Sequence, residues 1–159
     1  MIFYHYTARE YLDSILREGL TKGDVPLLNT ATYQAEGVNA VWLTTSRDPS
    51  GHGLGDGARP LTREECRMLG VPLGARFPDK RAVRITVKMP KDRLKHWPSY
   101  ARKRIDPRLY NTLSDIGGGE RVAKTWYISF QPIPPEMFST VEVRGEDGKW
   151  QEYRAATTG

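Results

Sequence analysis

The chain opens with MIFYHYTAREYLDSILREGL, residues 1–20, and the first part of this stretch predicts a short strand. Residues Ile2 to Tyr6 are apolar or aromatic except for one histidine. Because side chains alternate along a strand, Phe3, His5 and Thr7 are expected to share one face. Two interpretations of His5 follow from this position: a core residue with satisfied ring nitrogens, or a group that binds a ligand at the end of a strand.

The second part of the stretch predicts a helix that begins directly after the strand. Residues 7–10, TARE, match a capping box in which Thr7 accepts from first-turn amides and Glu10 reaches back. Gly19 is expected to end this helix. The apolar residues at helical spacing in between are Tyr11, Leu12, Ile15 and Leu16. A strand running straight into a helix, with a histidine at the junction, is the central structural prediction.

The rest of the chain predicts more strands and helices. Alternation favours strands over 40–46, buried at Val41 and Leu43, and over 81–90, with Val83, Ile85 and Val87 on one face. The following elements are also expected: a long surface loop over 21–39, a helix over 61–70 capped by Thr62, a helix in two pieces over 99–119 divided near Pro107, and two or three strands over 124–153 with a hairpin turn at 146–149. Together they predict an α+β domain over residues 1–159, with mixed or antiparallel sheets and flanking helices.

Composition narrows the class of protein. The 159 residues are 38% hydrophobic and 27% charged, as in a globular domain with its own core. No apolar run is long enough to span a membrane, and the N-terminus lacks the pattern of a signal peptide, so we expect a cytoplasmic protein. The single cysteine, Cys66, excludes an internal disulfide and a zinc site made of cysteines, and no metal is expected.

Positive charge is concentrated in one segment. The net charge is +5, but residues 80–108 alone hold eleven basic residues against Asp92 and Asp106. Within it, KHWPSYARKR interleaves Trp97 and Tyr100 with cations, a pattern that suits nucleic acid because rings stack on bases while cations neutralise phosphates. A helix that carries cations for solubility is the alternative.

Three segments together resemble the ADP-ribosyltransferase superfamily. FYHYT and SILREGL, residues 3–7 and 14–20, are similar to the opening strand and helix of its histidine-type branch, whose relatives include RNA 2′-phosphotransferases. GVNAVWLTTS, residues 37–46, is similar to the second motif, and TWYISFQPIPPEMFSTVEV, residues 125–143, to the late strand and its proline-containing segment. The resemblance implies an ADP-ribosyltransferase-like fold with split sheets, and NAD as the molecule consumed.

The resemblance also implies site residues. His5 would donate a hydrogen bond to ribose hydroxyls, Thr7 would hold the nicotinamide carboxamide, and Tyr6 or Trp42 would stack on the nicotinamide ring. Thr44 and Thr45 would complete the ribose contacts. Arg47 and Arg84 would bind the pyrophosphate, because the guanidinium fork matches phosphate geometry. Core packing explains Trp42 equally well, and strand propensity explains both threonines.

The third motif departs from the superfamily pattern. Active members usually hold a catalytic glutamate at the start of the late strand, where this chain has Thr125 or Trp126. Gln131 is the nearest amide and the candidate for this catalytic role beside His5 and Trp42. The nearby carboxylates are Glu120, Glu136 and Glu142. Three explanations of this departure are open. The chain resembles phosphate-transferring relatives that need no glutamate, another carboxylate takes the place of the glutamate, or the chain binds its ligand without catalysis.

Three functions are consistent with these residues. The first is transfer of ADP-ribose from NAD to a macromolecule, with nucleic acid favoured by the basic segment. The second is a non-catalytic module that binds nucleic acid or protein on the same fold. The third is a metal-independent ribonuclease that uses His5 or His52 with an arginine. His52 lies in GHGLGDG, residues 51–57, which is a phosphate cradle, a lid over a ligand, or a plain surface loop.

Overall fold

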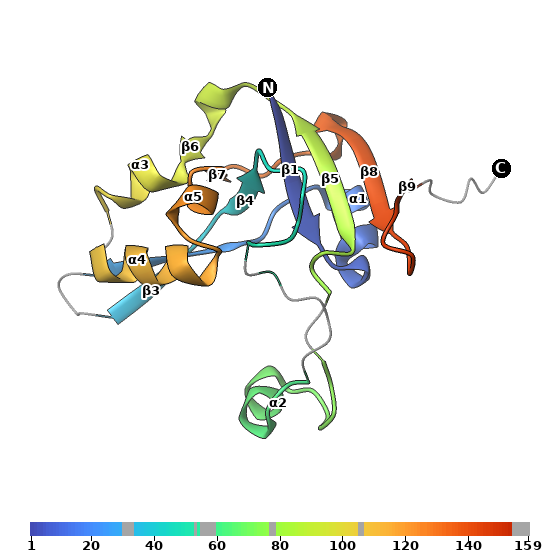
Figure 1. The fold of residues 1–159 in the computed structure, drawn as a ribbon, viewed down its shortest axis with the longest axis horizontal. Coiled ribbons are helices and arrows are strands. Elements are labelled where there is room, and N and C mark those ends of the chain that lie inside the picture. Colours follow the sequence, from blue (N-terminus) through green and yellow to red (C-terminus); the bar gives the residue numbers. More distant parts are fainter. Residues whose placement is uncertain (30–33, 53, 55–59, 77–78, 105–106, 154–159) are drawn as a thin grey trace.

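A seven-stranded antiparallel sheet forms the centre of the molecule (Figure 1). The computed structural model describes residues 1–29, 34–52, 54, 60–76, 79–104 and 107–153. The strands lie in the order β6-β7-β4-β1-β5-β8-β9. Their bounds are β1 Ile2–Thr7, β4 Val41–Thr44, β5 Val83–Lys88, β6 Lys95–His96, β7 Trp126–Ser129, β8 Phe138–Arg144 and β9 Trp150–Glu152. The mixed α+β class is therefore confirmed, and the described strands form this seven-stranded sheet and a separate two-stranded one.

The predicted opening strand is confirmed and lies in the middle of this sheet. β1 pairs with β5 along its whole length, from Ile2 opposite Lys88 to Thr7 opposite Val83, and with β4 on its other side. The alternation along β1 follows from this pairing. Phe3 faces the core together with Val83, Ile85 and Val87 of the paired strand β5. His5 lies on the same face of β1 as Phe3.

The helix after β1 is confirmed, but its predicted cap is wrong. Thr7 is a buried strand residue, because β1 continues to pair with β5 at this position. A short 3-10 helix, η1 Arg9–Tyr11, then leads into α1 Leu12–Glu18, with Ala8 at the cap position and no side-chain cap. Gly19 ends α1 at φ 87°, as predicted.

Within the predicted loop over residues 21–39, the described segments 24–29 and 34–39 instead form two paired strands, called the β2–β3 hairpin here. β2 Asp24–Asn29 and β3 Gln34–Asn39 pair only with each other, in an antiparallel two-stranded sheet. The Asn39 side chain fixes the base of this hairpin: it accepts from the Gly23 amide at 3.1 Å and donates to the Thr21 carbonyl at 2.8 Å. Glycine, proline and asparagine disfavoured a strand locally, and pairing between the two segments overrode this preference.

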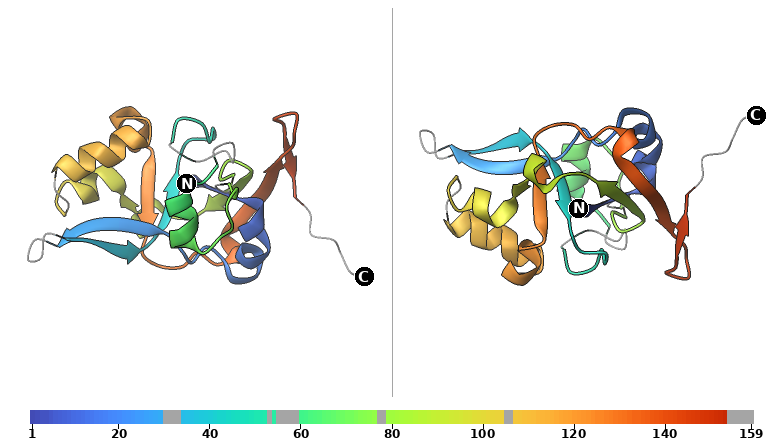
Figure 2. Two further views of the ribbon diagram at one scale, coloured as in Figure 1. Left: turned by 90° about the horizontal axis from the view of Figure 1, so that it is seen from below. Right: turned by 90° about the horizontal axis from the view of Figure 1, so that it is seen from above.

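Two apolar clusters lie on opposite faces of the large sheet. Phe3, Ile85 and Leu43 form one with α1, since Leu12 of this helix belongs to the same cluster. Trp97 and Ile128 form the other under the helices of the opposite face. These helices are α3 Trp97–Ala101, α4 Pro107–Ile116 and α5 Glu120–Ala123, and Figure 2 shows α3 and α4 gathered at one side of the molecule and α1 at the other. The two short 3-10 helices η2 Lys91–Arg93 and η3 Pro135–Met137 connect strands.

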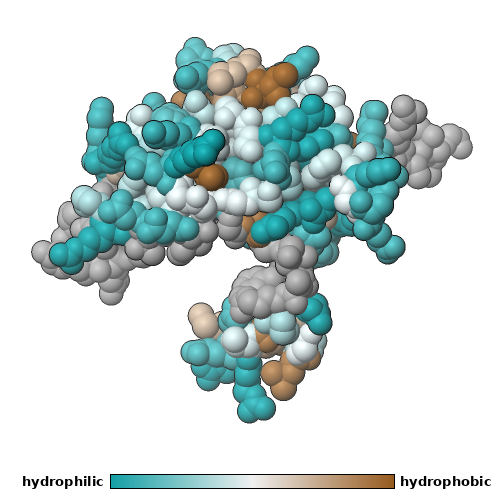
Figure 3. Space-filling model, viewed as in Figure 1, coloured by the Kyte–Doolittle hydropathy of each residue, from teal (hydrophilic) through white to brown (hydrophobic). Residues whose placement is uncertain are grey.

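The predicted helix at Thr62 is confirmed and stands apart from the sheet in Figure 1. α2 Arg63–Leu69 begins with a complete capping box between Thr62 and Glu65, and Cys66 is buried within this unit. Met68 and Leu73 are 77% and 67% exposed, and apolar side chains are visible on this unit in Figure 3. Among the described residues, no helix has both the length and the apolar character needed to cross a bilayer.

Candidate functional site

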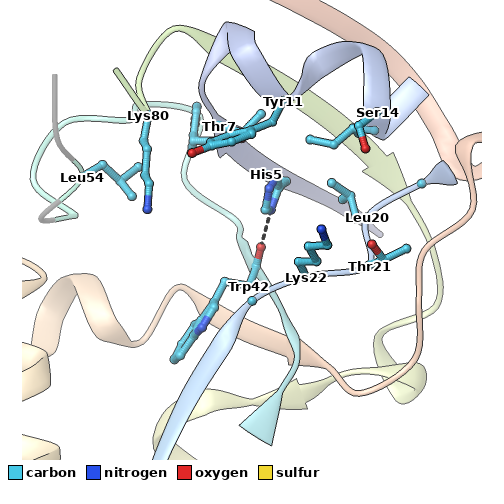
Figure 4. Close-up of a pocket in the computed structure, with 14 residues that line it drawn as sticks. His5, Thr7, Tyr11, Ser14, Leu20, Thr21, Lys22, Trp42, Leu54 and Lys80 are labelled. Atoms are coloured by element: carbon cyan, nitrogen blue, oxygen red, sulfur yellow. Dashed lines mark hydrogen bonds between the residues drawn. The ribbon is translucent and has the colours of Figure 1, made fainter. Parts of the chain in front are cut away.

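A cavity of about 650 Å³ lies beside the junction of β1 and α1 (Figure 4). This volume falls in the range of small-molecule and cofactor sites, roughly 300–1,000 Å³. It is lined by His5, Tyr6, Thr7, Tyr11, Ser14, Ile15, Gly19, Leu20, Thr21, Lys22, Gly23, Trp42, Leu54 and Lys80. The structure therefore brings together four of the predicted site residues: His5, Tyr6, Thr7 and Trp42.

His5 is held in one tautomer by the neighbouring strand. Its Nδ1 lies 2.8 Å from the Trp42 carbonyl oxygen, which can only accept, so Nδ1 carries the proton and donates it. Burial lowers the pKa of His5, and nearby Lys80 lowers it further, so the ring is neutral at pH 7. Nε2 is then an acceptor. The expectation that His5 donates to a ribose is thus corrected: a ribose hydroxyl would donate to His5.

Two aromatic rings form the accessible walls of the cavity. Tyr11 is 45% exposed at its rim, and the half-buried Trp42 lies at the opposite side in Figure 4. Tyr6 is less suited to stack on a ligand, because it is 8% exposed and its hydroxyl donates to the Ser46 carbonyl at 2.9 Å. Burial also raises the pKa of Tyr6, so its hydroxyl stays protonated.

Two lysines supply the charge of the cavity. Figure 4 shows Lys80 and Lys22 extending toward the cavity from opposite sides of His5. Both are exposed, so their ammonium groups are hydrated and able to meet an anion. The lining residues within the described part of the chain include no carboxylate. An anionic ligand is therefore favoured by the field of this cavity.

The threonines and Arg47 of the predicted site lie outside the lining. Thr44 is 6% exposed, and its hydroxyl bonds to the Thr125 hydroxyl at 2.8 Å and accepts from the Ser46 amide at 3.0 Å. The Thr45 amide donates to the Thr125 carbonyl at 3.0 Å. Arg47 is exposed beyond the end of β4. These residues secure the end of β4 instead of facing the cavity.

Arg84 is buried and paired within the protein, which corrects its predicted place on a basic surface. Its Nε and Nη2 each donate to a Glu142 carboxylate oxygen at 3.0 Å, and Nη1 donates to the Arg47 carbonyl at 2.8 Å. The guanidinium also lies 4.3 Å from the centre of the Trp150 ring. Because Arg84 is 4% exposed and its charge is matched by Glu142, it acts as a structural cation within the sheet.

The candidates for the catalytic position of the third motif also lie outside the cavity. Gln131 is exposed just after β7. Its backbone amide donates to the Ser129 hydroxyl, and its backbone carbonyl accepts from the same hydroxyl. Glu120 pairs with Arg102 at the surface, Glu142 pairs with Arg84, and Glu136 is exposed in η3. The structure thus brings none of these four side chains into the lining.

His52 anchors the described part of the glycine-rich loop to the sheet. Its Nδ1 accepts from Trp126 Nε1 at 2.9 Å, so Nε2 carries the proton and donates to the Asp48 carbonyl at 3.1 Å. Beside it, a Cβ on Gly118 would lie 1.8 Å from the Gly51 carbonyl oxygen, so only glycine allows this close approach. With both nitrogens in use, His52 is unsuited to act as a general base. Residues 53 and 55–59 of this loop lie outside the described residues.

The His52 anchor predicts a loss of stability in acid. Burial lowers the pKa of His52 from 6.5, so the folded state favours the neutral ring. Its contribution is complete above pH 6.5 and is lost as the pH falls through the folded pKa. Between about pH 7.5 and about pH 5, we expect the free energy of unfolding, measured in urea, to fall further in the wild type than in His52→Gln. Equal losses in the two proteins would contradict the anchor.

Sequence reasoning missed several residues of the cavity. Ser14, Thr21 and Lys22 come from α1 and the segment before β2, and Lys80 was counted only as part of the basic segment. Tyr11 was assigned to the buried stripe of a helix. An available signal was its place in the first turn after the strand, where the chain turns back over His5.

Comparisons of this chain with models of protein families, with curated proteins and with solved structures found no match. Among the described residues, no group of three His, Cys, Asp or Glu is placed to hold a metal ion. The function of the site is therefore argued from its own residues.

Proposed function

We propose that the chain binds NAD in the cavity and transfers ADP-ribose to a macromolecular acceptor, with nucleic acid favoured. The observation that carries this proposal is the fixed tautomer of His5, whose acceptor Nε2 belongs to a cavity with aromatic walls and two lysines. A nucleotide sugar offers the matching groups: hydroxyls that donate, a ring that stacks, and phosphates that attract cations.

Each part of NAD has a partner in this arrangement. A ribose hydroxyl donates to His5 Nε2, which fixes the sugar against the end of β1. The nicotinamide or adenine ring stacks on Trp42 or Tyr11, and Lys22 and Lys80 neutralise the pyrophosphate in place of the arginines expected from the sequence. This arrangement orients the bond between ribose C1′ and the nicotinamide nitrogen for attack.

The proposed transfer step exchanges one bond at ribose C1′. The bond to nicotinamide breaks, its electron pair stays with the ring nitrogen, and neutral nicotinamide leaves. An ionised oxygen of the acceptor forms the new bond to C1′, so no proton has to be removed. A phosphate on the acceptor is largely ionised at neutral pH, so its oxygen attacks without a general base. The lack of a carboxylate among the described lining residues suits such an acceptor best.

Calorimetry with NAD tests the binding part of the proposal. We expect saturable binding that weakens about tenfold in Lys80→Ala and in Lys22→Ala, because each change removes a charge-assisted contact. Lys88→Ala is the matched control, since Lys88 is exposed on β5 and lies outside the lining residues. No heat at millimolar NAD, or equal weakening in all three variants, would overturn the site.

A non-catalytic binding module is the second candidate. It is favoured by the same lack of a carboxylate among the described lining residues, and by the position of Gln131 and Glu142 outside the cavity. Such a module would bind an oligonucleotide, and labelled NAD would leave no label on DNA, RNA or protein. A metal-independent ribonuclease is disfavoured on both histidines: the two ring nitrogens of His52 are engaged, and the described lining residues around His5 include no arginine to act with it.

A further inference from the structure

A second aromatic group lies at the surface where α3 and β7 end. The Tyr100 and Phe130 rings have centroids 5.4 Å apart at an interplanar angle of 55°, and the Arg104 guanidinium lies 4.7 Å from the centre of the Tyr100 ring. Phe130 is 36% exposed, and Tyr100 is half-buried. We call Tyr100, Arg104 and Phe130 the aromatic platform.

We propose that the aromatic platform binds single-stranded nucleic acid by stacking its bases. The exposed Phe130 ring and the Arg104 guanidinium that covers the Tyr100 ring offer flat surfaces on which unpaired bases stack. A duplex hides those base faces within its own stack, so an unpaired strand is the form that fits. Single-stranded nucleic acid would then be the acceptor of the proposed function. Only this acceptor role rests on the proposed function, since stacking of bases on the platform needs no NAD.

The charge around the platform matches a phosphate backbone. Arg102, Lys103 and Arg104 are consecutive and exposed in the turn after α3. Arg102 donates to Glu120 at 2.8 Å, but both side chains are more than half exposed, at 61% and 54%. An ion pair of this kind contributes little to stability, so Arg102 can exchange Glu120 for a phosphate at small cost. Trp97, also expected from the sequence to stack on bases, is fully buried and excluded from this role.

The platform is continuous with the cavity through one aromatic cluster. Trp42 and Tyr100 both pack against the buried residues Ala40, Trp97, Ala101, Tyr110 and Ile128. The Trp42 ring also contacts Trp97 edge-on, with centroids 4.7 Å apart, while Trp42 lines the cavity. Tyr100 of the platform and Trp42 of the cavity therefore pack against one buried cluster.

Fluorescence anisotropy with a labelled single-stranded oligonucleotide tests the platform. We expect Phe130→Ala and Phe130→Leu each to weaken binding at least about fivefold, because leucine keeps the apolar volume without a flat ring. Arg104→Lys should weaken binding although the charge is kept, since only the guanidinium stacks. Arg93→Ala is the matched control: Arg93 is exposed in η2, and its loss should lower affinity only through charge, an effect that disappears in high salt.

The outcomes separate this inference from the proposed function. Equal affinity for duplex and single strand, or wild-type affinity in both Phe130 variants, would overturn the platform. A wild type that binds the oligonucleotide but gives no calorimetric signal with NAD would keep the platform and remove the transferase. Thermal melting of each variant confirms that it is folded, and NAD binding should be unchanged in the Phe130 variants.

Discussion

Replacing His5 by asparagine is expected to lower ADP-ribose transfer about a hundredfold while the fold is kept. The asparagine amide nitrogen takes the position of Nδ1 and still donates to the Trp42 carbonyl, which accepts from His5 at 2.8 Å in the wild type. What disappears is Nε2, the proposed acceptor for a ribose hydroxyl of NAD. A sugar without this partner is misplaced relative to the attacking group, and small misplacements slow transfer strongly.

The measurement is the rate at which label from NAD appears on a single-stranded oligonucleotide. His96→Asn is the matched control, because both ring nitrogens of this histidine bond within the protein, to Ser99 Oγ and to the Lys124 carbonyl, and His96 is not among the lining residues. Transfer by His5→Asn at the wild-type rate would contradict the role of Nε2.

The pH profile of the wild type provides a second readout for His5. Because burial lowers the pKa of His5 below 6.5, Nε2 is an acceptor at neutral and alkaline pH and becomes a donor only in acid. The rate should therefore be level around neutral pH and fall on the acid side, below pH 6.5.

Removing the carboxylate of Glu142 is expected to cost about 3–5 kcal/mol of unfolding free energy. Arg84 is 4% exposed, and two of its nitrogens donate to Glu142. In Glu142→Ala the guanidinium keeps the Arg47 carbonyl and the Trp150 ring but no counter-charge, and a buried unpaired cation is strongly destabilising. The double variant Arg84→Met with Glu142→Leu should recover most of the loss, because no charge is then buried.

Urea unfolding at neutral pH measures this difference. Glu120→Ala is the control, since it breaks the exposed ion pair with Arg102 and should cost less than about 1 kcal/mol. Similar losses in Glu142→Ala and Glu120→Ala would contradict the structural role of Arg84. That result would also make Arg84 a candidate for binding a ligand again.

Local patterns in the sequence were sufficient for the elements that position the site. Alternation predicted β1, β4 and β5, with the correct inward faces for β4 and β5, and Gly19 and the Thr62 cap predicted a helix end and a helix start. These features depend on backbone geometry and on neighbours within a few residues. The Thr7 cap failed for the opposite reason: the residue is held by a strand that lies far away in the sequence.

The composition of the site was decided only by the tertiary structure. Arg84 and Glu142 are 58 residues apart, yet β5 and β8 place them opposite each other, which turns a presumed phosphate ligand into a buried ion pair. Lys22 and Lys80 meet at one cavity from distant segments in the same way. The sequence determined that an imidazole ends a strand before a helix, because this follows from local periodicity. Its tautomer, its cationic neighbours and its cavity follow from strand pairing, since a side chain's partners across a sheet are set by register and not by its own neighbours.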